Sequence, residues 1–256
     1  MNTLVSIRDL GVCYDNVVAL EHVYLDIYDN DFIGVIGPNG GGKSSLVKAI
    51  MGVTSYTGNI EYSAALYRGN KPHIGYLPQI SSFDKAFPIS VREVVMSGLQ
   101  HDHRFIGRYR REDKLKAEEL LERASLAELS RRPIGELSGG QLQRVMLCRA
   151  IISEPRLLLL DEPANFVDNR FENELYNMLH LLSERMAMVM VSHDLGTISS
   201  VVRSIVCVNG HVHRHDSNVI TDEQLRNYDC PLQIVTHGNI PHTVLGAHHH
   251  CPHCDE

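Results

Sequence analysis

The stretch Gly37-Pro38-Asn39-Gly40-Gly41-Gly42-Lys43-Ser44 follows one apolar run, Phe32 to Ile36, and precedes a second with helical spacing, Leu46 to Met51. It matches the pattern G-x-x-x-x-G-K-[ST]. Glycines let the backbone of such a loop turn its N–H groups toward a phosphate chain, and the positive end of the following helix points to the same place. The pattern predicts that Lys43 reaches the β- and γ-phosphates of a nucleotide and that Ser44 offers its hydroxyl to Mg²⁺.

Composition limits the remaining possibilities. The 256 residues suffice for one large α/β domain, or for one domain with an appendage. A formal charge of −7, from 24 Lys+Arg against 31 Asp+Glu, argues against nucleic acid as a partner. No apolar stretch approaches the roughly 18 residues that span a bilayer, and the N-terminus lacks the layout of a signal peptide, so we expect a cytosolic protein with reduced cysteines.

Short apolar segments on both sides of the glycine-rich loop predict a sheet with a helical insertion. Leu4–Ile7 and Val23–Tyr28 alternate as half-exposed antiparallel strands do, and His73–Leu77 is a further strand that Pro78 ends. Residues 80–135 are predicted to be mostly helical, with a capping box at Ser90 and Glu93 and an amphipathic helix over 112–129. The inward side of that helix is predicted to carry Leu115, Leu120, Leu121 and Ala124.

A second helix is predicted to begin at Ser138-Gly139-Gly140-Gln141, directly after Leu137. A Ser-Gly-Gly sequence at a helix N-terminus is a second potential anion-binding end. One chain with two such ends, about 95 residues apart, raises the question of whether both serve one nucleotide.

The apolar run Leu157–Leu160 is typical of a buried parallel strand, and it ends in Asp161-Glu162. Open α/β sheets bind ligands at this edge, where one carboxylate can hold Mg²⁺ and the next can activate water. Another such strand, Ala187–Val191, leads to His193. Position alone leaves His193 either a polar turn residue or part of the same site.

Together these segments resemble the nucleotide-binding subunit of an ATP-binding-cassette (ABC) transporter, from residue 3 to about residue 228. The glycine-rich loop resembles the Walker A motif, Leu137 to Gln141 the signature motif, and Leu157 to Glu162 the Walker B motif. The resemblance implies a P-loop ATPase fold with an antiparallel β subdomain and a helical subdomain at about 80–135. It also implies catalysis of ATP hydrolysis, with Mg²⁺ as cofactor.

Individual roles follow from the same resemblance. Tyr14 corresponds to the aromatic residue that stacks on adenine, and Gln79 to the glutamine near Mg²⁺ and the attacking water. His193 corresponds to the histidine at the γ-phosphate, and Asp168 to the aspartate that crosses the dimer interface. The implied catalytic residues are Glu162, His193, Gln79 and Lys43. The implied Mg²⁺ ligands are Ser44, Gln79 and Asp161. The implied nucleotide contacts further include Gly37, Pro38, Asn39, Gly40, Gly41, Gly42, Ser45, Ser138, Gly139, Gly140 and Gln141. Many relatives carry Ala and Thr where this chain has Gly41 and Ser45.

The resemblance implies partners as well. In that family two subunits enclose two ATP molecules, each held between the Walker A motif of one and the signature motif of the other. The pair drives integral-membrane permease subunits from the cytoplasmic face of the membrane, and a substrate-binding protein takes part indirectly.

The cargo is predicted from two segments, Gly75-Tyr76-Leu77-Pro78-Gln79 and Val95-Met96-Ser97-Gly98-Leu99, that are similar to those of zinc, manganese and iron uptake ATPases. Zinc is the first choice, with manganese or iron next. Several alternatives stay open: transport of haem, a siderophore or cobalamin, transport outward, a cassette ATPase of DNA repair or translation, and a metal chaperone.

The last residues, His248-His249-His250-Cys251-Pro252-His253-Cys254-Asp255-Glu256, give independent support for a metal. Imidazole and thiolate groups suit Zn²⁺, or Cu(I). We therefore predict that a His/Cys-rich tail, residues 229–256, binds Zn²⁺ through His248, His249, His250, Cys251, His253 and Cys254, and buffers it or reports its level. A solvated chelator without a role is the alternative.

Overall fold

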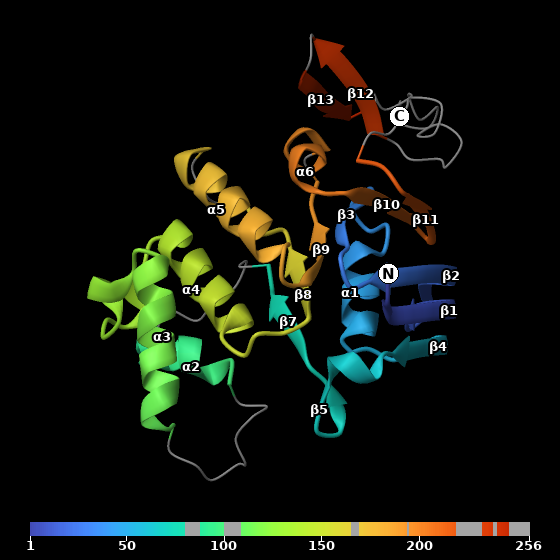
Figure 1. Cartoon of the computed structure of the whole chain (residues 1–256). Coiled ribbons are helices and arrows are strands. Elements are labelled where there is room, and N and C mark those ends of the chain that lie inside the picture. Colours follow the sequence, from blue (N-terminus) through green and yellow to red (C-terminus); the bar gives the residue numbers. More distant parts are fainter. Residues whose placement is uncertain are drawn as a thin grey trace, which may run out of the picture.

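The computed structural model describes residues 1–79, 88–99, 109–164, 169–193, 195–218, 232–237 and 240–245. Its centre is a six-stranded sheet of order β11-β10-β3-β9-β8-β7, in which only β11 is antiparallel to its neighbour (Figure 1). The strands are β3 (Phe32–Ile36), β7 (Ile74–Leu77), β8 (Leu157–Asp161), β9 (Ala187–Val191), β10 (Ser204–Asn209) and β11 (His211–His215). Every residue of β3, β8 and β9 is buried, which explains their continuous apolar sequences.

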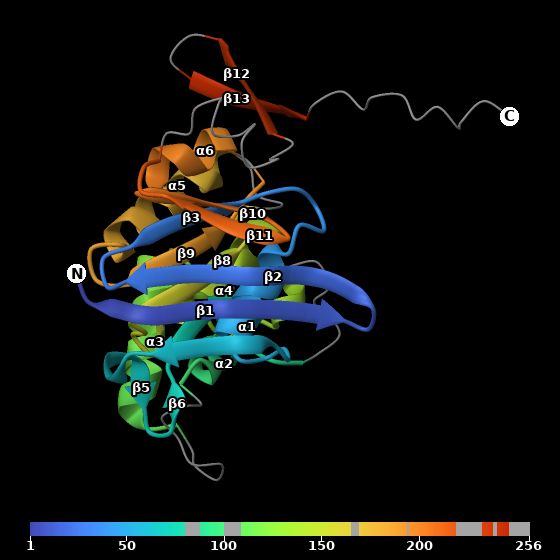
Figure 2. The same cartoon turned by 90° about the vertical axis from the view of Figure 1, so that its right-hand side faces the viewer.

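A second, antiparallel sheet has the order β2-β1-β4 and lies beside α1 (Figure 2). Its strands are β1 (Thr3–Tyr14), β2 (Val17–Tyr28) and β4 (Thr57–Tyr62), and α1 spans Lys43–Ile50. β1 extends to Tyr14, further than the Leu4–Ile7 segment in which alternation was recognised, because a bulged register carries its pairing with β2 to the end of the strand. A short 3₁₀ helix (Ala64–Leu66) and a small hairpin of β5 (Tyr67–Arg68) and β6 (Lys71–Pro72) lead to β7.

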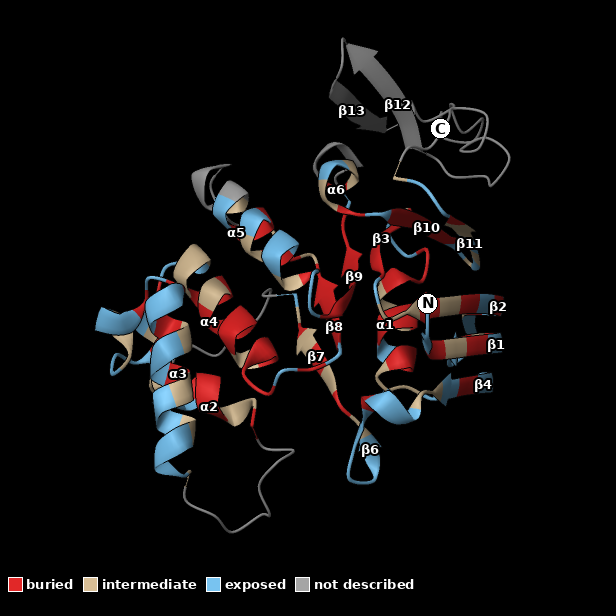
Figure 3. Cartoon of the chain, in the orientation of Figure 1, coloured by how far each residue is buried: buried red, intermediate tan, exposed pale blue. Residues whose placement is uncertain are grey.

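The two faces of the central sheet contribute to different hydrophobic cores. Leu157 and Leu159 of β8 pack with α1 and the antiparallel sheet, whereas Leu158 and Leu160 pack with α4 (Gly139–Ile151) and α5 (Asn169–Leu182). The two helices that follow the predicted anion-binding sequences, α1 and α4, therefore cover opposite faces of one sheet (Figures 1 and 3).

The helical group contains α2 (Val91–Ser97), α3 (Arg111–Arg123), α4 and the 3₁₀ turns Ala127–Leu129 and Ile134–Glu136. The predicted capping box is present, since Glu93 N–H donates to Ser90 Oγ and Ser90 N–H to Glu93 Oε2. The prediction for 112–129 was wrong in two respects. The helix ends at Arg123, and Leu115 is 54% exposed because the buried stripe of α3 is formed by Ala117 and Leu121.

α6 (Leu195–Val201) lies between β9 and β10 in the chain and packs on β3. Beyond β11, the described strands are β12 (Leu232–His237) and β13 (Ile240–Leu245). β12 and β13 pair antiparallel from Leu232↔Leu245 to His237↔Ile240, and β13 lies against α6. These strands fall inside the predicted tail. Asp168 and the cysteine and histidine residues from 248 to 254 lie outside the described residues. Within the described ranges, no helix has the length and apolar character to span a membrane.

Candidate functional site

The loop from Gly37 to Gly42 joins β3 to α1 and depends on its glycines. Gly37 has φ 149°, and a Cβ there would lie 2.0 Å from Val208 O. Gly42, the N-cap of α1, has φ 100°, and its Cβ would lie 2.5 Å from Ala19 O. The loop can follow this path only without side chains at these positions, because the backbones of Val208 and Ala19 lie against it.

Lys43, the first residue of α1, bends back over the loop. Its Nζ donates to Gly37 O at 2.9 Å and to Pro38 O at 2.8 Å, and the residue is only 7% exposed. A nearly buried ammonium inside a glycine loop and at a helix N-terminus makes the site strongly attractive to an anion. Lys43 thus lies over the glycine loop, and its contact with the β- and γ-phosphates stays a prediction.

Asp161 ends β8 beside Ser44, which hydrogen-bonds to its carboxylate. Burial raises the pKa of Asp161 above its ordinary value, and the hydrogen bond from Ser44 offsets part of that rise. A buried carboxylate next to a hydroxyl supplies the oxygen ligands that Mg²⁺ prefers. The residues present therefore fit a nucleotide phosphate chain with its Mg²⁺.

Glu162 is the point where three strand ends meet. Gln79 Nε2 donates to Glu162 Oε2 at 3.1 Å, and His193 Nδ1 lies 3.7 Å from the same oxygen. Glu162 has φ 50°, a left-handed conformation that is uncommon outside glycine, and its N–H donates to Val191 O at 3.0 Å. The side chain of Glu162 is 16% exposed and that of His193 62%. The carboxylate is thus held in place and still reachable by water.

Tyr14 is 41% exposed at the end of β1. Its hydroxyl receives hydrogen bonds from Ser45 of α1 and from Thr54, whose Oγ1 lies 3.5 Å away, and these lower the pKa of Tyr14. Val17 and Val18, on the neighbouring strand, are 68% and 59% exposed. Sequence reasoning missed Val17, Val18 and Thr54, because only their position beside Tyr14 distinguishes them from ordinary apolar and turn residues.

The signature-like residues are not brought to this cluster. Ser138 is the N-cap of α4, where Gln141 N–H donates to Ser138 Oγ at 3.3 Å and Ser138 N–H donates to Gln141 Oε1 at 3.0 Å. The helix end that this capping box forms is exposed and has Gly139 and Gly140 in its first turn. It lies on the face of the sheet opposite α1. Among the described residues, no group of three or more His, Cys, Asp or Glu side chains could hold a metal ion.

The family model described as "ABC transporter" matches residues 20–165. The chain is 36% identical over 207 residues to the high-affinity zinc uptake system ATP-binding protein ZnuC of Bacillus subtilis, covering 79% of this chain and 90% of that protein. It is 35% identical over 210 residues to the manganese transport system ATP-binding protein MntB of Halalkalibacterium halodurans, covering 82% and 84%.

Among solved structures, the chain is similar to a chain of a transporter described as of the metal-chelate ABC type, in an inward-facing conformation. The TM-score is 0.79 at 27% identity, and the match covers 95% of this chain and 97% of that one.

Proposed function

The chain belongs to the ABC transporter family as an ATP-binding subunit that hydrolyses ATP, and on that premise we propose that it powers import of a divalent metal ion, zinc first and manganese or iron next. The observation that carries the ATPase part is the meeting of Gln79 and His193 at Glu162, beside the buried Asp161.

Each residue of this cluster has a proposed task. Bound ATP with Mg²⁺ supplies the phosphoryl group and the positive charge that makes it transferable. Glu162 accepts the proton of the attacking water at Oε2. Gln79 and His193 fix the direction of that carboxylate, and Lys43 neutralises phosphate charge. Tyr14, with Val17 paired opposite it, offers a partly apolar surface suited to the adenine ring.

A dimer follows from the two sheet faces. Since α1 and α4 cover opposite faces, Ser138 and Gly139 cannot reach a nucleotide in the Gly37–Ser44 loop of their own chain. The helix end at Ser138 is therefore proposed to contact ATP bound to a second copy. The ATPase rate per chain should then rise with protein concentration until all chains are paired. A rate per chain that stays constant while the protein is diluted about a thousandfold, across the micromolar range, would speak against pairing.

The cargo assignment rests on the relatives, whose names include zinc and manganese transport, and on the sequence similarities of residues 75–79 and 95–99. Import, in place of export, is supported by the words "uptake system" in the name of the zinc relative. The permease subunits would contact the cassette from the membrane side.

The decisive experiment measures the zinc, manganese and iron content of cells that lack this protein, grown with each metal limiting. Cells restored with the intact protein should regain one metal selectively, whereas cells restored with Lys43→Ala should not. Restoration by both forms would contradict an ATP-driven role. Unchanged metal contents in the deficient cells, after removal of any parallel importer, would contradict a metal cargo.

We also propose that the terminal histidine and cysteine residues bind Zn²⁺. The support is their sequence, a C-x-x-C pair at Cys251 and Cys254 among four histidines. Truncation after Leu245 removes this motif and keeps β13. The truncated protein should lose zinc in equilibrium dialysis, and equal zinc retention by both forms would remove this proposal.

A further inference from the structure

The hairpin of β10 and β11 touches the Gly37–Ser44 loop at its turn. Gly210 N–H donates to Gly41 O at 3.0 Å, and Glu21 N–H donates to Gly210 O at 2.9 Å. Val208 O also approaches the loop closely, because it lies 2.0 Å from where a Cβ on Gly37 would stand and 2.8 Å from a Cβ on Gly41. The turn therefore fixes the carbonyl of one loop residue and packs against another.

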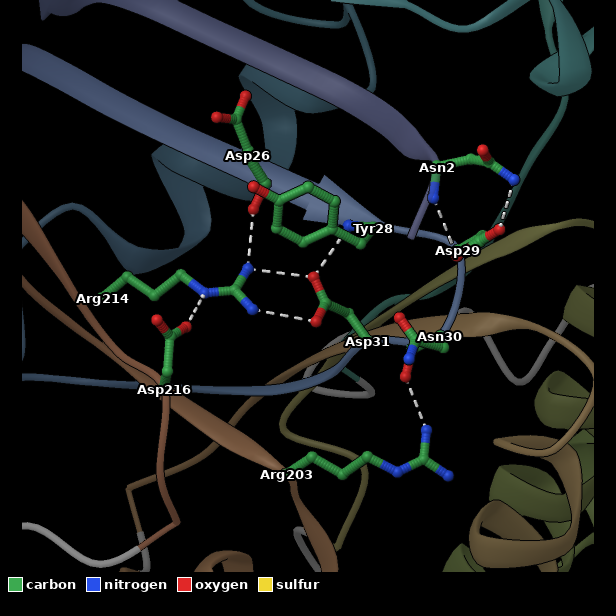
Figure 4. A network of polar contacts seen from close by, with 9 residues as sticks. All are labelled: Asn2, Asp26, Tyr28, Asp29, Asn30, Asp31, Arg203, Arg214 and Asp216. Carbon is green, nitrogen blue, oxygen red and sulfur yellow. Dashed lines mark hydrogen bonds and ion pairs between the residues drawn. The ribbon is translucent and has the colours of Figure 1, made fainter.

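The opposite end of β11 is anchored by Arg214 (Figure 4). Its two terminal nitrogens donate to Asp31 Oδ1 and Oδ2, both at 2.9 Å, and Nε donates to Asp216 Oδ1 at 2.8 Å. It also donates to Asp26 O at 2.7 Å, and its guanidinium carbon lies 5.3 Å from the centre of the Tyr28 ring. The hydrogen bonds with Asp31 and then Asp216 raise the pKa of Arg214, so its charge is permanent.

Asp31 connects this anchor to the strand that carries the loop. It directly precedes β3, its side chain is 8% exposed, and its Oδ2 also accepts the N–H of Tyr28 at 2.7 Å. Its carbonyl accepts Met188 N–H of β9 at 2.8 Å. β3 thus begins at the Arg214 anchor and ends at the loop that the hairpin turn touches.

The register places β11 alongside that path as a strut, with β10 between β11 and β3. β10 pairs with β3 at Val206↔Val35 and Cys207↔Ile36, and with β11 at Val206↔Arg214 and Asn209↔His211. The four steps from Gly210 to Arg214 span about 13 Å of extended chain. The two hydrogen bonds from the Arg214 guanidinium to the Asp31 carboxylate fix the register of β11, because a slip of one residue would break both.

We propose that the β10–β11 hairpin, anchored by Arg214 on Asp31, is a brace that sets the position of Gly41 and so positions the loop for the phosphates of ATP. Arg214 is in this view a positioning residue that never touches the nucleotide. The inference rests on the proposed use of residues 37–44 as the phosphate site.

The test compares three variants of the full chain with the parent protein. Asp31→Asn with Arg214→Met removes both charges, so that no buried carboxylate stays unpaired, and Arg214→Lys keeps the charge but loses the fork. The matched control is Arg123→Gln, which breaks the exposed pair of Arg123 with Glu119, at 2.6 Å on α3, and leaves the hairpin and its anchor unchanged.

Two readouts are taken well below the melting temperature: hydrogen exchange of the loop and of Gly210 without nucleotide, and the Kd for a fluorescent trinitrophenyl ATP analogue. In the double variant, exchange of Gly210 should quicken and the Kd should rise about tenfold, as misplacement of a binding group predicts. Arg214→Lys should shift both in the same direction by less, and Arg123→Gln should change neither.

Exchange and affinity that stay within about twofold of the parent, with only a lower melting temperature, would overturn the brace and leave a purely structural ion pair. If the double variant does not fold, the hydrogen exchange and the Kd of Arg214→Lys are judged by the same criterion. Lys43→Ala separates the two proposals: unaffected analogue binding in that variant would remove the phosphate site itself, whereas lost binding there with unchanged Arg214 variants would remove only the brace.

Discussion

Replacing Glu162 with Gln isolates the chemistry of the carboxylate from its structural role. The substitution keeps the shape of the side chain, and the backbone bond from residue 162 to Val191 O does not depend on it. An amide oxygen can still accept Gln79 Nε2, which lies 3.1 Å from Oε2. The contact with His193, a 3.7 Å pair to a side chain that is 62% exposed, is worth at most about 0.5 kcal/mol. Glu162→Gln should therefore leave stability nearly unchanged.

The effect on hydrolysis should be large. An amide cannot accept the proton of water, and the loss of a general base typically slows a reaction by about 10² to 10⁴. That range corresponds to roughly 3–5 kcal/mol in the activation barrier. The affinity for ATP should stay within about threefold, because Lys43 and the loop are untouched. ATP should then accumulate between paired chains and hold them together.

Phosphate release, analogue titration and gel filtration with ATP and Mg²⁺ test these three expectations on one preparation. Glu61→Gln is the matched control, since Glu61 Oε1 accepts an amide hydrogen bond from Asn59 at 2.9 Å on an exposed strand. Turnover of Glu162→Gln within about tenfold of the parent would refute the assignment of Glu162 as the base. Elution as a monomer alone, with ATP bound, would refute the pairing.

Three further predictions concern neighbouring positions. Lys43→Ala should weaken binding of the ATP analogue at least about tenfold, because it removes the cation that caps the loop, and unchanged binding in a titration would contradict this. Gly98→Ala should lower the melting temperature by roughly 5 °C, because the new Cβ would lie 2.0 Å from Arg149 O, and a shift under about 1 °C would show that α2 and α4 separate easily. Asp161→Asn should raise the melting temperature without nucleotide at pH 7 and abolish Mg²⁺-dependent binding. Burial raises the pKa of Asp161 in the folded state, so the protonated carboxyl favours folding, and that stability is lost as pH rises through the raised pKa. Because asparagine carries no charge at any pH, the gain in melting temperature from Asp161→Asn should shrink when melting is measured toward pH 4.

The sequence predicted those parts of the fold that depend on neighbours in the chain. The run from Phe32 to Ser44 gave a strand, loop and helix, and Leu157 to Glu162 gave a buried strand with its carboxylates, because periodicity and glycine content are local properties. The family match and the structural similarity confirm the fold and the ATPase activity. The roles of single residues in the site stay predictions.

Features that depend on distant partners were not predictable. Arg214 and Asp31 are 183 positions apart, and each resembles an ordinary surface charge until the sheet brings them together. The prediction of the buried face of α3 was wrong because the sequence of this helix, rich in Glu and Lys, is compatible with more than one buried face. Packing of α3 on α4 determines which face is buried, and Leu115 lies outside it. β12 and β13 were not predicted, although Gly238-Asn239 separates two runs with strand composition, which is a hairpin signal. The histidines and cysteines that follow led to the interpretation of the whole segment as a metal-binding tail.

The position of Glu162 follows from the order of the strands. β7, β8 and β9 are adjacent and parallel, and the pairs Leu77↔Leu160 and Leu160↔Met190 place their ends in line. A residue that continued β8 in extended conformation would point its side chain to one face of the sheet. The left-handed turn at Glu162, fixed by its bond to Val191 O, instead moves the side chain into the gap where Gln79 and His193 emerge from the flanking strands. Glu162 thus combines an uncommon backbone conformation with a carboxylate that the ends of two flanking strands approach, and among the acidic residues that the structure describes this convergence supports Glu162 as the base.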